Sequence, residues 1–234
     1  MLSESEGYDL LSKYGIPTPK YRIVTRAEDA GLAAEAIGFP VVMKIISPDI
    51  IHKSDAGGVI VGIGTKEAAQ SAYNQIVANA RAYNSNADIH GVIVENQAAP
   101  GLELIIGGKT DPTFGKVITF GIGGTLVELM RDVTLRILPI DEEEIRKMVK
   151  DIDSYPLIAG YRGSKPKDEE CLIQVIKNVC KMFEDQKELR EFDINPIRLY
   201  DSGACAVDAR IIMDDHIQVY NIVDQEPVPP EYFK

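Results

Sequence analysis

The segment HKSDAGG (52–58) combines residue types suited to nucleophilic or acid–base chemistry, and it lies between two apolar runs. Near neutral pH an unperturbed imidazole keeps a free nitrogen lone pair, so His52 could act as a general base or a nucleophile. Gly57 and Gly58 would make the turn flexible and let its backbone N–H groups approach a phosphate closely. The alternative is an ordinary surface-loop histidine without a chemical role.

A second set of oxygen-bearing side chains stands in EFDINP (191–196) and AVDAR (206–210). Residues two apart in a strand share a face, so Asp193 and Asn195 should project together with Glu191. A short turn, YDSG, returns the chain and can bring Asp208 to the same face of a neighbouring strand. Oxygen ligands without His or Cys suit Mg²⁺, which also takes phosphate oxygens or water. A solvated, mildly repulsive sheet face is the alternative.

Three further charged residues occupy strands or strand ends. Lys44 interrupts the apolar run VVMKII (41–46), and a buried ammonium requires a partner. The alternative is a lysine that reaches solvent from the end of its strand. Glu95 and Glu103 stand near the ends of two consecutive predicted strands, where they could equally be ordinary edge charges.

The common nucleotide and metal motifs are absent from the sequence. No GxxxxGK[ST] motif is present, and FGIGG (120–124) follows a strand without completing GxGxxG. The three histidines show no metal-ligand spacing, and the three cysteines form no CxxC pair. Neither a simple P-loop nor a zinc site is therefore expected.

Residues 1–90 alternate helical and extended patterns, which predicts a small α/β unit. Ser3 and Glu6 form a capping-box pattern that begins a first helix, which should end at Gly15. The further expected elements are strands at 21–24 and 41–46 and helices at 27–37 and 65–83.

Residues 91–234 have a different texture, and we expect a second, α+β subdomain with a mostly antiparallel sheet. Strands at 91–96 and 102–108 should be joined by a short connection, QAAPG. The other expected elements are a strand at 116–124, helices at 141–152 and from Asp168, and strands at 190–200, 204–213 and 217–222. The boundary between the subdomains is predicted near residue 90.

Composition is that of an ordinary globular protein, with 45% hydrophobic and 26% charged residues. The net charge of −11 argues against a general nucleic-acid binder, although local cations could still bind an anionic ligand. The scattered cysteines fit a reducing compartment, and neither a membrane span nor a basic signal sequence is seen. We therefore expect a cytoplasmic protein.

Taken in order, these segments resemble the ATP-grasp domain of the β subunit of ADP-forming acetyl-CoA synthetase, in the nucleoside-diphosphate-forming acyl-CoA ligase family. The resemblance covers about residues 3–213. The segments that carry it are YGIPTP, GFPVVMKIISPDIIHKSDAGGV, GVIVENQAAPGLELIIGGKTDPTFG, FGIGGTLVELMRDVTLRILPI, YPLIAGYRG and EFDINPI with AVDAR. Each motif alone is weak, but the ordered set is highly specific.

The resemblance implies a nucleotide, ATP or ADP, sandwiched between two subdomains, and it assigns a role to each residue. In relatives the position of Lys44 contacts phosphates, that of Glu95 borders the adenine at a hinge, and that of Glu103 binds the ribose. The positions of Asn195 and Asp208 bind Mg²⁺, that of Asp193 lies near an incoming phosphohistidine, and that of His52 is the second phosphohistidine, with Gly57 and Gly58 as hinge and phosphate cradle. From charge and position we add Arg136 and Lys53 as cations that would oppose the acidic background.

The implied reaction converts acetyl-CoA, ADP and phosphate into acetate, ATP and CoA. Its phosphoryl group passes from an α-subunit histidine to His52 and then to ADP. The sequence has no CoA-binding domain, so an obligate α subunit is expected, in an α₂β₂ assembly.

Two alternatives remain. The first is another ATP-grasp ligase, such as a succinyl-CoA synthetase β subunit. The HKSDAGG loop and the short segment after VDAR argue against it. The second is a non-catalytic ATP-sensing module. That alternative does not explain why Lys44, His52 and Asp208 should be present together.

Overall fold

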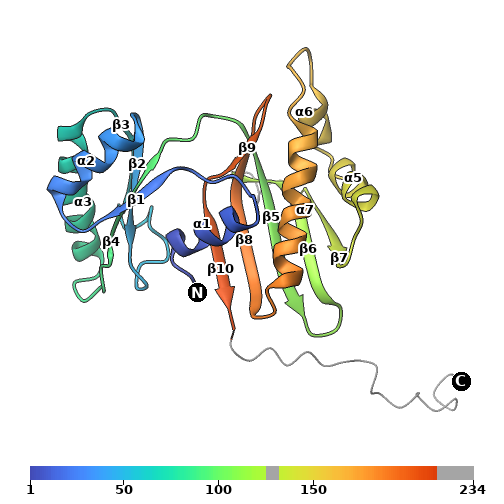
Figure 1. Ribbon diagram of the computed structural model, residues 1–234, viewed down its shortest axis with the longest axis horizontal. Helices are drawn as coiled ribbons and strands as arrows, with labels where there is room; N and C mark the ends of the chain where they lie inside the picture. Colours follow the sequence, from blue (N-terminus) through green and yellow to red (C-terminus); the bar gives the residue numbers. More distant parts are fainter. Residues whose placement is uncertain (125–131, 215–234) are drawn as a thin grey trace, which may run out of the picture.

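The computed structural model describes residues 1–124 and 132–214, which form two antiparallel sheets with helices packed on them (Figure 1). The first sheet contains, in spatial order, β1 (Tyr21–Val24), β4 (Gly91–Asn96), β2 (Val41–Ile46) and β3 (Val59–Ile63). Helices α2 (Ala27–Ile37) and α3 (Lys66–Tyr83) cover one of its faces, on the left of Figure 1. Small alanines on both helices allow this close packing, since Ala30, Ala34, Ala69 and Ala72 are all buried.

The second, larger sheet has the order β10 (Ala209–Met213), β8 (Leu189–Leu199), β5 (Leu102–Asp111), β6 (Gly115–Ile122) and β7 (Val133–Ile137). The short strand β9 (Ala204–Ala206) also pairs with β8. Helices α5 (Glu142–Lys150) and α7 (Glu169–Asp185) pack on one face of this sheet, and α6 (Tyr155–Ala159) lies between them in the chain. Eight side chains on α7 are buried in the larger core, so this helix supplies much of that core.

Helix α1 (Glu4–Lys13) begins the chain but packs with the larger sheet, beside β10 (Figure 1). Its capping box forms as predicted, because the Ser3 hydroxyl accepts from Glu6 N–H and Glu6 accepts from Ser3 N–H. Tyr8 and Leu11 are fully buried in the larger core. The first residues of the chain therefore belong structurally to the larger subdomain.

The change from one sheet to the other differs from the prediction near residue 90. Strand β4 lies in the middle of the first sheet and pairs with both β1 and β2, whereas β5 is central in the second sheet. The predicted short connection between them is therefore not a hairpin turn. It is residues 97–101, which cross from one sheet to the other.

Other predicted elements agree closely with the structure. The strand predicted at 41–46 is β2, and the helix predicted from Asp168 is α7, with Asp168 accepting from Cys171 N–H. The predicted combination of helices with antiparallel sheets in two subdomains is present. The strand predicted at 217–222 lies outside the described residues. Within the described part of the chain, no helix combines the length and apolarity that crossing a bilayer requires.

The attachment of α1 can be tested through its core contacts. We expect Leu11→Ala to lower the free energy of unfolding by about 2–5 kcal/mol, because it opens a cavity beneath the helix. The exposed residue Lys13 on the same helix is the control, and Lys13→Ala should change it by less than about 0.5 kcal/mol. Urea unfolding measures both values. Equal effects of the two variants would mean that α1 is not anchored through this core.

Candidate functional site

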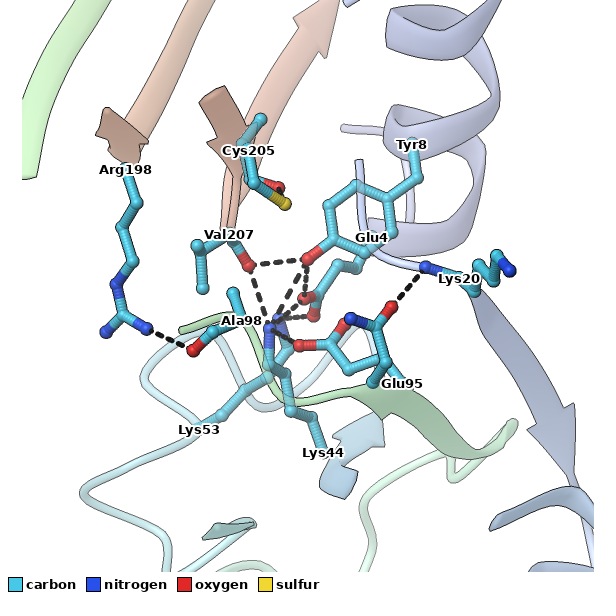
Figure 2. A network of polar contacts seen from close by, with 12 residues as sticks. Glu4, Tyr8, Lys20, Lys44, Lys53, Glu95, Ala98, Arg198, Cys205 and Val207 are labelled. Carbon is cyan, nitrogen blue, oxygen red and sulfur yellow. Dashed lines mark hydrogen bonds and ion pairs between the residues drawn. The ribbon is translucent and has the colours of Figure 1, made fainter. Parts of the chain in front are cut away.

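A buried cluster of charges joins α1 to the first sheet (Figure 2). Lys44 Nζ, from the middle of β2, lies 2.6 Å from Glu4 Oε1 and 2.8 Å from Glu95 Oε1. It also donates to the carbonyl oxygen of Val207 at 3.1 Å. The ammonium group therefore has three close acceptors, and the carboxylate side chains are each only 2% exposed. The partner that the sequence required for Lys44 is a pair of carboxylates.

Glu4 has a second cationic partner. Its Oε2 accepts from Lys53 Nζ at 2.6 Å, so each carboxylate oxygen binds a different lysine. Tyr8, one turn further along α1, donates its hydroxyl to Val207 O at 2.5 Å and lies 3.0 Å from Glu4 Oε1. Helix α1 therefore places a fully bonded carboxylate at the centre of the cluster.

The charges in this cluster shift one another's pKa values. Burial lowers the pKa of Lys44, but the carboxylates of Glu4 and Glu95 more than offset this and raise it above its ordinary value. Burial raises the pKa of Glu4, but Lys44 and Lys53 outweigh it, so the net pKa is lowered. Glu4 and Lys44 are therefore both held in their charged forms.

Glu95 has the opposite balance. Burial raises its pKa to about 7, Lys44 lowers it and the neighbouring Glu4 charge raises it further. Its second oxygen, Oε2, is buried without a hydrogen-bond partner. Glu95 is thus the least stabilised anion in the cluster.

The predicted oxygen ligands lie on the larger sheet and face the same space. Asn195 is on β8, and its backbone N–H donates to Asp208 O at 3.2 Å, just before β10 begins. Burial raises the pKa of Asp208, and the Glu4 charge raises it further. Burial and Asp208 likewise raise the pKa of Asp193, whose Oδ1 has no hydrogen-bond partner. Of these side-chain oxygens, only Asp193 Oδ1 is buried without a hydrogen-bond partner, since Asn195 Oδ1 accepts from Gly124 N–H. Among the described residues, no group of three or more His, Cys, Asp or Glu side chains is placed to hold a metal ion, so any cation here would depend on the carboxylate–amide pair together with water or phosphate oxygens.

A cavity of about 680 Å³ between the two sheets collects most of the predicted residues. It is lined from the first sheet by Lys44 and Glu95, and from the larger one by Glu103, Asn195 and Asp208. His52 and Lys53 line the same cavity. The volume is in the range of small-molecule sites, and the apolar side chains of Val42, Val59 and Val207 complete its wall.

A second cavity, of about 590 Å³, adjoins the first on the side of α1. His52, Lys53, Asn195 and Asp208 line both cavities, whereas Asp193 lines only the second. Glu191, which was expected to project beside Asp193, lines neither. The loop that carries His52 thus lies where the two cavities meet.

The glycines of this loop have a structural role that differs in part from the prediction. Gly57 has φ +60°, and a Cβ there would lie 2.8 Å from Asn79 Nδ2. The N–H groups of Gly57 and Gly58 already donate to Ser54 O and Lys53 O, and neither residue lines either of the two cavities described above. A phosphate cradle made of these two groups is therefore not supported. The backbone turns at Gly57 with positive φ, whereas the predicted role of the two glycines as a flexible hinge stays a prediction.

Arg136 is not in the site, which corrects the prediction. It lies on β7, at the far edge of the larger sheet, where it forms ion pairs with Glu144 and Asp151. The charge-based argument could not place it, because a sequence does not tell which strand forms the edge of a sheet. Lys53, the other cation proposed on charge, does line both cavities.

Sequence reasoning missed three residues of the site. Glu4 was hidden within a capping-box pattern, and its neighbour Glu6 was singled out instead. Arg198 lies opposite Glu103 on the paired strands, binds its Oε1 at 3.0 Å and donates to Ala98 O in the crossing segment. Gly124 has φ +67° and donates to Asn195 Oδ1, and a Cβ there would collide with the Glu103 carboxylate. Only the pairing of Arg198 with Glu103 could have been suspected from the sequence, as opposite charges on neighbouring strands. Recognising it would have required knowing how the residues of the two strands align.

Comparisons with known proteins identify the family of the chain. The family model described as an ATP-grasp domain matches residues 1–213. The β subunit of acetate–CoA ligase [ADP-forming] I from Pyrococcus furiosus is 44% identical over 212 residues, which are 91% of each chain. The chain therefore belongs to the ATP-grasp family, among the β subunits of ADP-forming acetate–CoA ligases.

Two solved structures of Ca. Korarchaeum cryptofilum dinucleotide-forming acetyl-coenzyme A synthetase 1 have the same fold. One, in complex with coenzyme A, Ca-AMPCP and HgCl⁺, is 41% identical with a TM-score of 0.87, covering 91% of this chain and 93% of that one. The other contains coenzyme A and Mg-AMPPCP, with a phosphohistidine segment pointing towards the nucleotide-binding site. It is 39% identical, with a TM-score of 0.79 and coverage of 90% and 92%.

The raised pKa of Glu95 predicts a pH-dependent stability. Between its unfolded value near 4.5 and about 7, the folded protein binds one more proton at this site, so stability falls as pH rises. Relative to Glu95→Gln, the wild-type free energy of unfolding should fall by on the order of 3 kcal/mol across this window. Urea unfolding of both proteins at several pH values measures the difference. A pH-independent difference would mean that Glu95 is not buried in this way.

The position of Arg136 predicts that it contributes to stability but not to ligand binding. Arg136→Met should lower the free energy of unfolding by about 1 kcal/mol, because two partly exposed ion pairs are lost, one with Glu144 on α5 and one with Asp151 just after it. The dissociation constant for Mg·ATP, measured by calorimetry, should stay within about twofold. A tenfold increase in the dissociation constant for Mg·ATP would mean that Arg136 does contribute to nucleotide binding.

Proposed function

We propose that this chain is the nucleotide-binding β subunit of an ADP-forming acetate–CoA ligase, and that His52 carries the phosphoryl group to ADP. The observation that carries the proposal is the shared cavity, in which Lys44, Glu103, Asn195 and Asp208 surround one space with His52 at its border. Separate loops and strands supply these residues, so their meeting is a property of the fold.

Each side chain has a role that its surroundings support. Lys44 is held charged at the cavity wall and would bind nucleotide phosphates. Glu103, fixed by Arg198, would accept hydrogen bonds from the ribose hydroxyls. The crossing segment 97–101 would border the base, with Glu95 directly before it. These contacts would position the nucleotide between the two sheets.

Asn195 and Asp208 would hold Mg²⁺ against the phosphates. One carboxylate and one amide oxygen are a small ligand set, which suits a cation that keeps waters and takes phosphate oxygens as ligands. The cation would supply charge neutralisation for the terminal phosphate. Asp193, with its unpartnered oxygen on the α1 side, would orient the imidazole of phosphorylated His52.

In the final step, a terminal phosphate oxygen of ADP attacks the phosphorus carried by His52. The P–N bond to the imidazole breaks as the new P–O bond forms, which gives ATP and neutral histidine. The exposed position of His52, on a loop between two cavities, suits a group that visits two sites. The acyl-phosphate and CoA chemistry would take place on an α subunit, in an α₂β₂ assembly.

The alternatives retained from the sequence are less favoured. A succinyl-CoA synthetase β subunit fits less well, because a relative of that name is 29% identical and has only 56% of its length covered. A non-catalytic sensor would not require a histidine at the cavity border.

Phosphorylation of His52 tests the proposal directly. With γ-labelled ATP and Mg²⁺, the chain together with its α partner should acquire acid-labile, base-stable label, and His52→Ala should abolish it on this chain. His90→Ala is the matched control, since His90 is also an exposed loop histidine lining the α1-side cavity. Label that survives in His52→Ala, or that occurs only on the α subunit, would contradict the carrier role.

The need for a partner can be tested separately. The purified chain alone should not convert acetyl-CoA, ADP and phosphate into ATP, and addition of the α subunit should restore the reaction. ATP formation measured with a coupled assay distinguishes the outcomes. Turnover by the chain alone would disprove the requirement for an α subunit.

A further inference from the structure

Glu4 connects the two subdomains across the site. It stands on α1, which packs in the larger core beside β10. Both of its cationic partners belong to the smaller subdomain, because Lys44 is on β2 and Lys53 is in the loop that follows β2. One carboxylate thus links the larger subdomain to a strand and to a loop of the smaller one.

The ion pair between Lys53 and Glu4 differs from the other polar contacts of the loop that carries His52. The other hydrogen bonds of loop residues 47–58 in the described chain stay within the smaller subdomain, as Ala56 N–H to His52 O and Gly58 N–H to Lys53 O illustrate. The hydrogen-bonded ion pair between Lys53 and Glu4, at 2.6 Å, is the one hydrogen bond of these described loop residues that reaches the larger subdomain. Lys53 is also the direct neighbour of His52.

The burial of the two partners is unequal, and this makes the contact breakable. The Glu4 side chain is 2% exposed and is held by Lys44 and Tyr8 as well, so it keeps its position. The Lys53 side chain is 23% exposed, on a flexible stem. The partly exposed Lys53 ammonium group can exchange the ion pair for solvation by water at a modest cost in free energy. The Glu4 carboxylate stays in place, because its other partners still compensate its buried charge.

We propose that Glu4 is a positioning residue that holds the stem of the His52 loop in the nucleotide cleft through Lys53, and that this ion pair opens whenever the loop leaves the cleft. The inference rests on the proposed carrier role of His52 and adds a residue that determines where the carrier stays. Glu4 simultaneously orients Lys44, so the loop and the phosphate-binding lysine are set by the same carboxylate.

Hydrogen exchange tests the clamp without any catalytic step. The N–H groups of Ala56, Gly57 and Gly58 have acceptors within the loop and report its opening. In the full-length chain, Glu4→Gln and Lys53→Gln should each speed exchange in residues 49–58 by at least about threefold, because each removes the same ion pair. The double variant should exceed neither single variant by more than about twofold. Exchange in α3 should stay unchanged.

Glu6→Gln is the matched control. It removes one negative charge from the same helix turn, and glutamine still completes the capping box. Its loop exchange should equal that of the wild type. If Glu4→Gln fails to fold, Lys53→Gln decides alone, because its side chain lies in the loop and is partly exposed. Unchanged loop exchange in Lys53→Gln would overturn the clamp.

A second measurement separates positioning from direct phosphate binding by Lys53. With the α partner, γ-labelled ATP should phosphorylate His52 about tenfold more slowly in Lys53→Gln, and at least as slowly in Glu4→Gln because that change also removes a partner of Lys44. The double variant should be no slower than Glu4→Gln alone. A loss in Lys53→Gln alone would assign Lys53 to the phosphate and overturn the clamp. If the wild type itself shows no label, the carrier role fails, while the exchange experiment still reports on the clamp.

Discussion

The site depends on one buried ammonium group and the carboxylates that surround it. Lys44 interrupts the fully buried strand β2, and a charge at that depth is tolerated only when opposite charges and hydrogen-bond acceptors meet it. Glu4 comes from α1, Glu95 from β4 and the Val207 carbonyl from the segment before β10. Because the buried Lys44 charge must be compensated, its partners bring together the first helix, the smaller sheet and the larger sheet.

The same cluster explains why the first helix belongs to the larger subdomain. The capping box fixes the first turn of α1 and so fixes the direction of Glu4, while Tyr8 and Leu11 bury one face of the helix in the larger core. Segment 97–101 and this cluster are two connections between the sheets, and Arg198 fastens the segment to β8. Charged contacts thus connect the two sheets on either side of the cavity between them.

Much of this arrangement could be predicted from the sequence, for identifiable reasons. Lys44 within an apolar strand predicted that its ammonium group would have a buried partner of opposite charge. The two-residue spacing of Asp193 and Asn195 predicted that both side chains lie on one face of their strand. Sheet membership could not be predicted in the same way. Strand β4 reads as a continuous apolar run, which indicates burial but not which sheet it joins, and the domain boundary was placed too early for that reason.

The residues that were missed share one cause: their roles come from contacts between distant segments. Glu4 and Lys53 are 49 positions apart, and Glu103 and Arg198 are 95 apart. Arg136 was assigned by charge alone, yet the position of β7 at the edge of the sheet directs it to α5. Residue type and spacing predicted the chemistry, whereas register and sheet order decided which side chains take part in it.

The most direct test of the central claim is a crystal structure of the chain with Mg²⁺ and a non-hydrolysable ATP analogue. We expect the nucleotide between the two sheets, its phosphates on Lys44, its ribose on Glu103 and the cation on Asn195 and Asp208. A nucleotide bound elsewhere, or a cation held by other residues while Lys44 keeps only its two carboxylates, would contradict the assignment of this cavity as the nucleotide site.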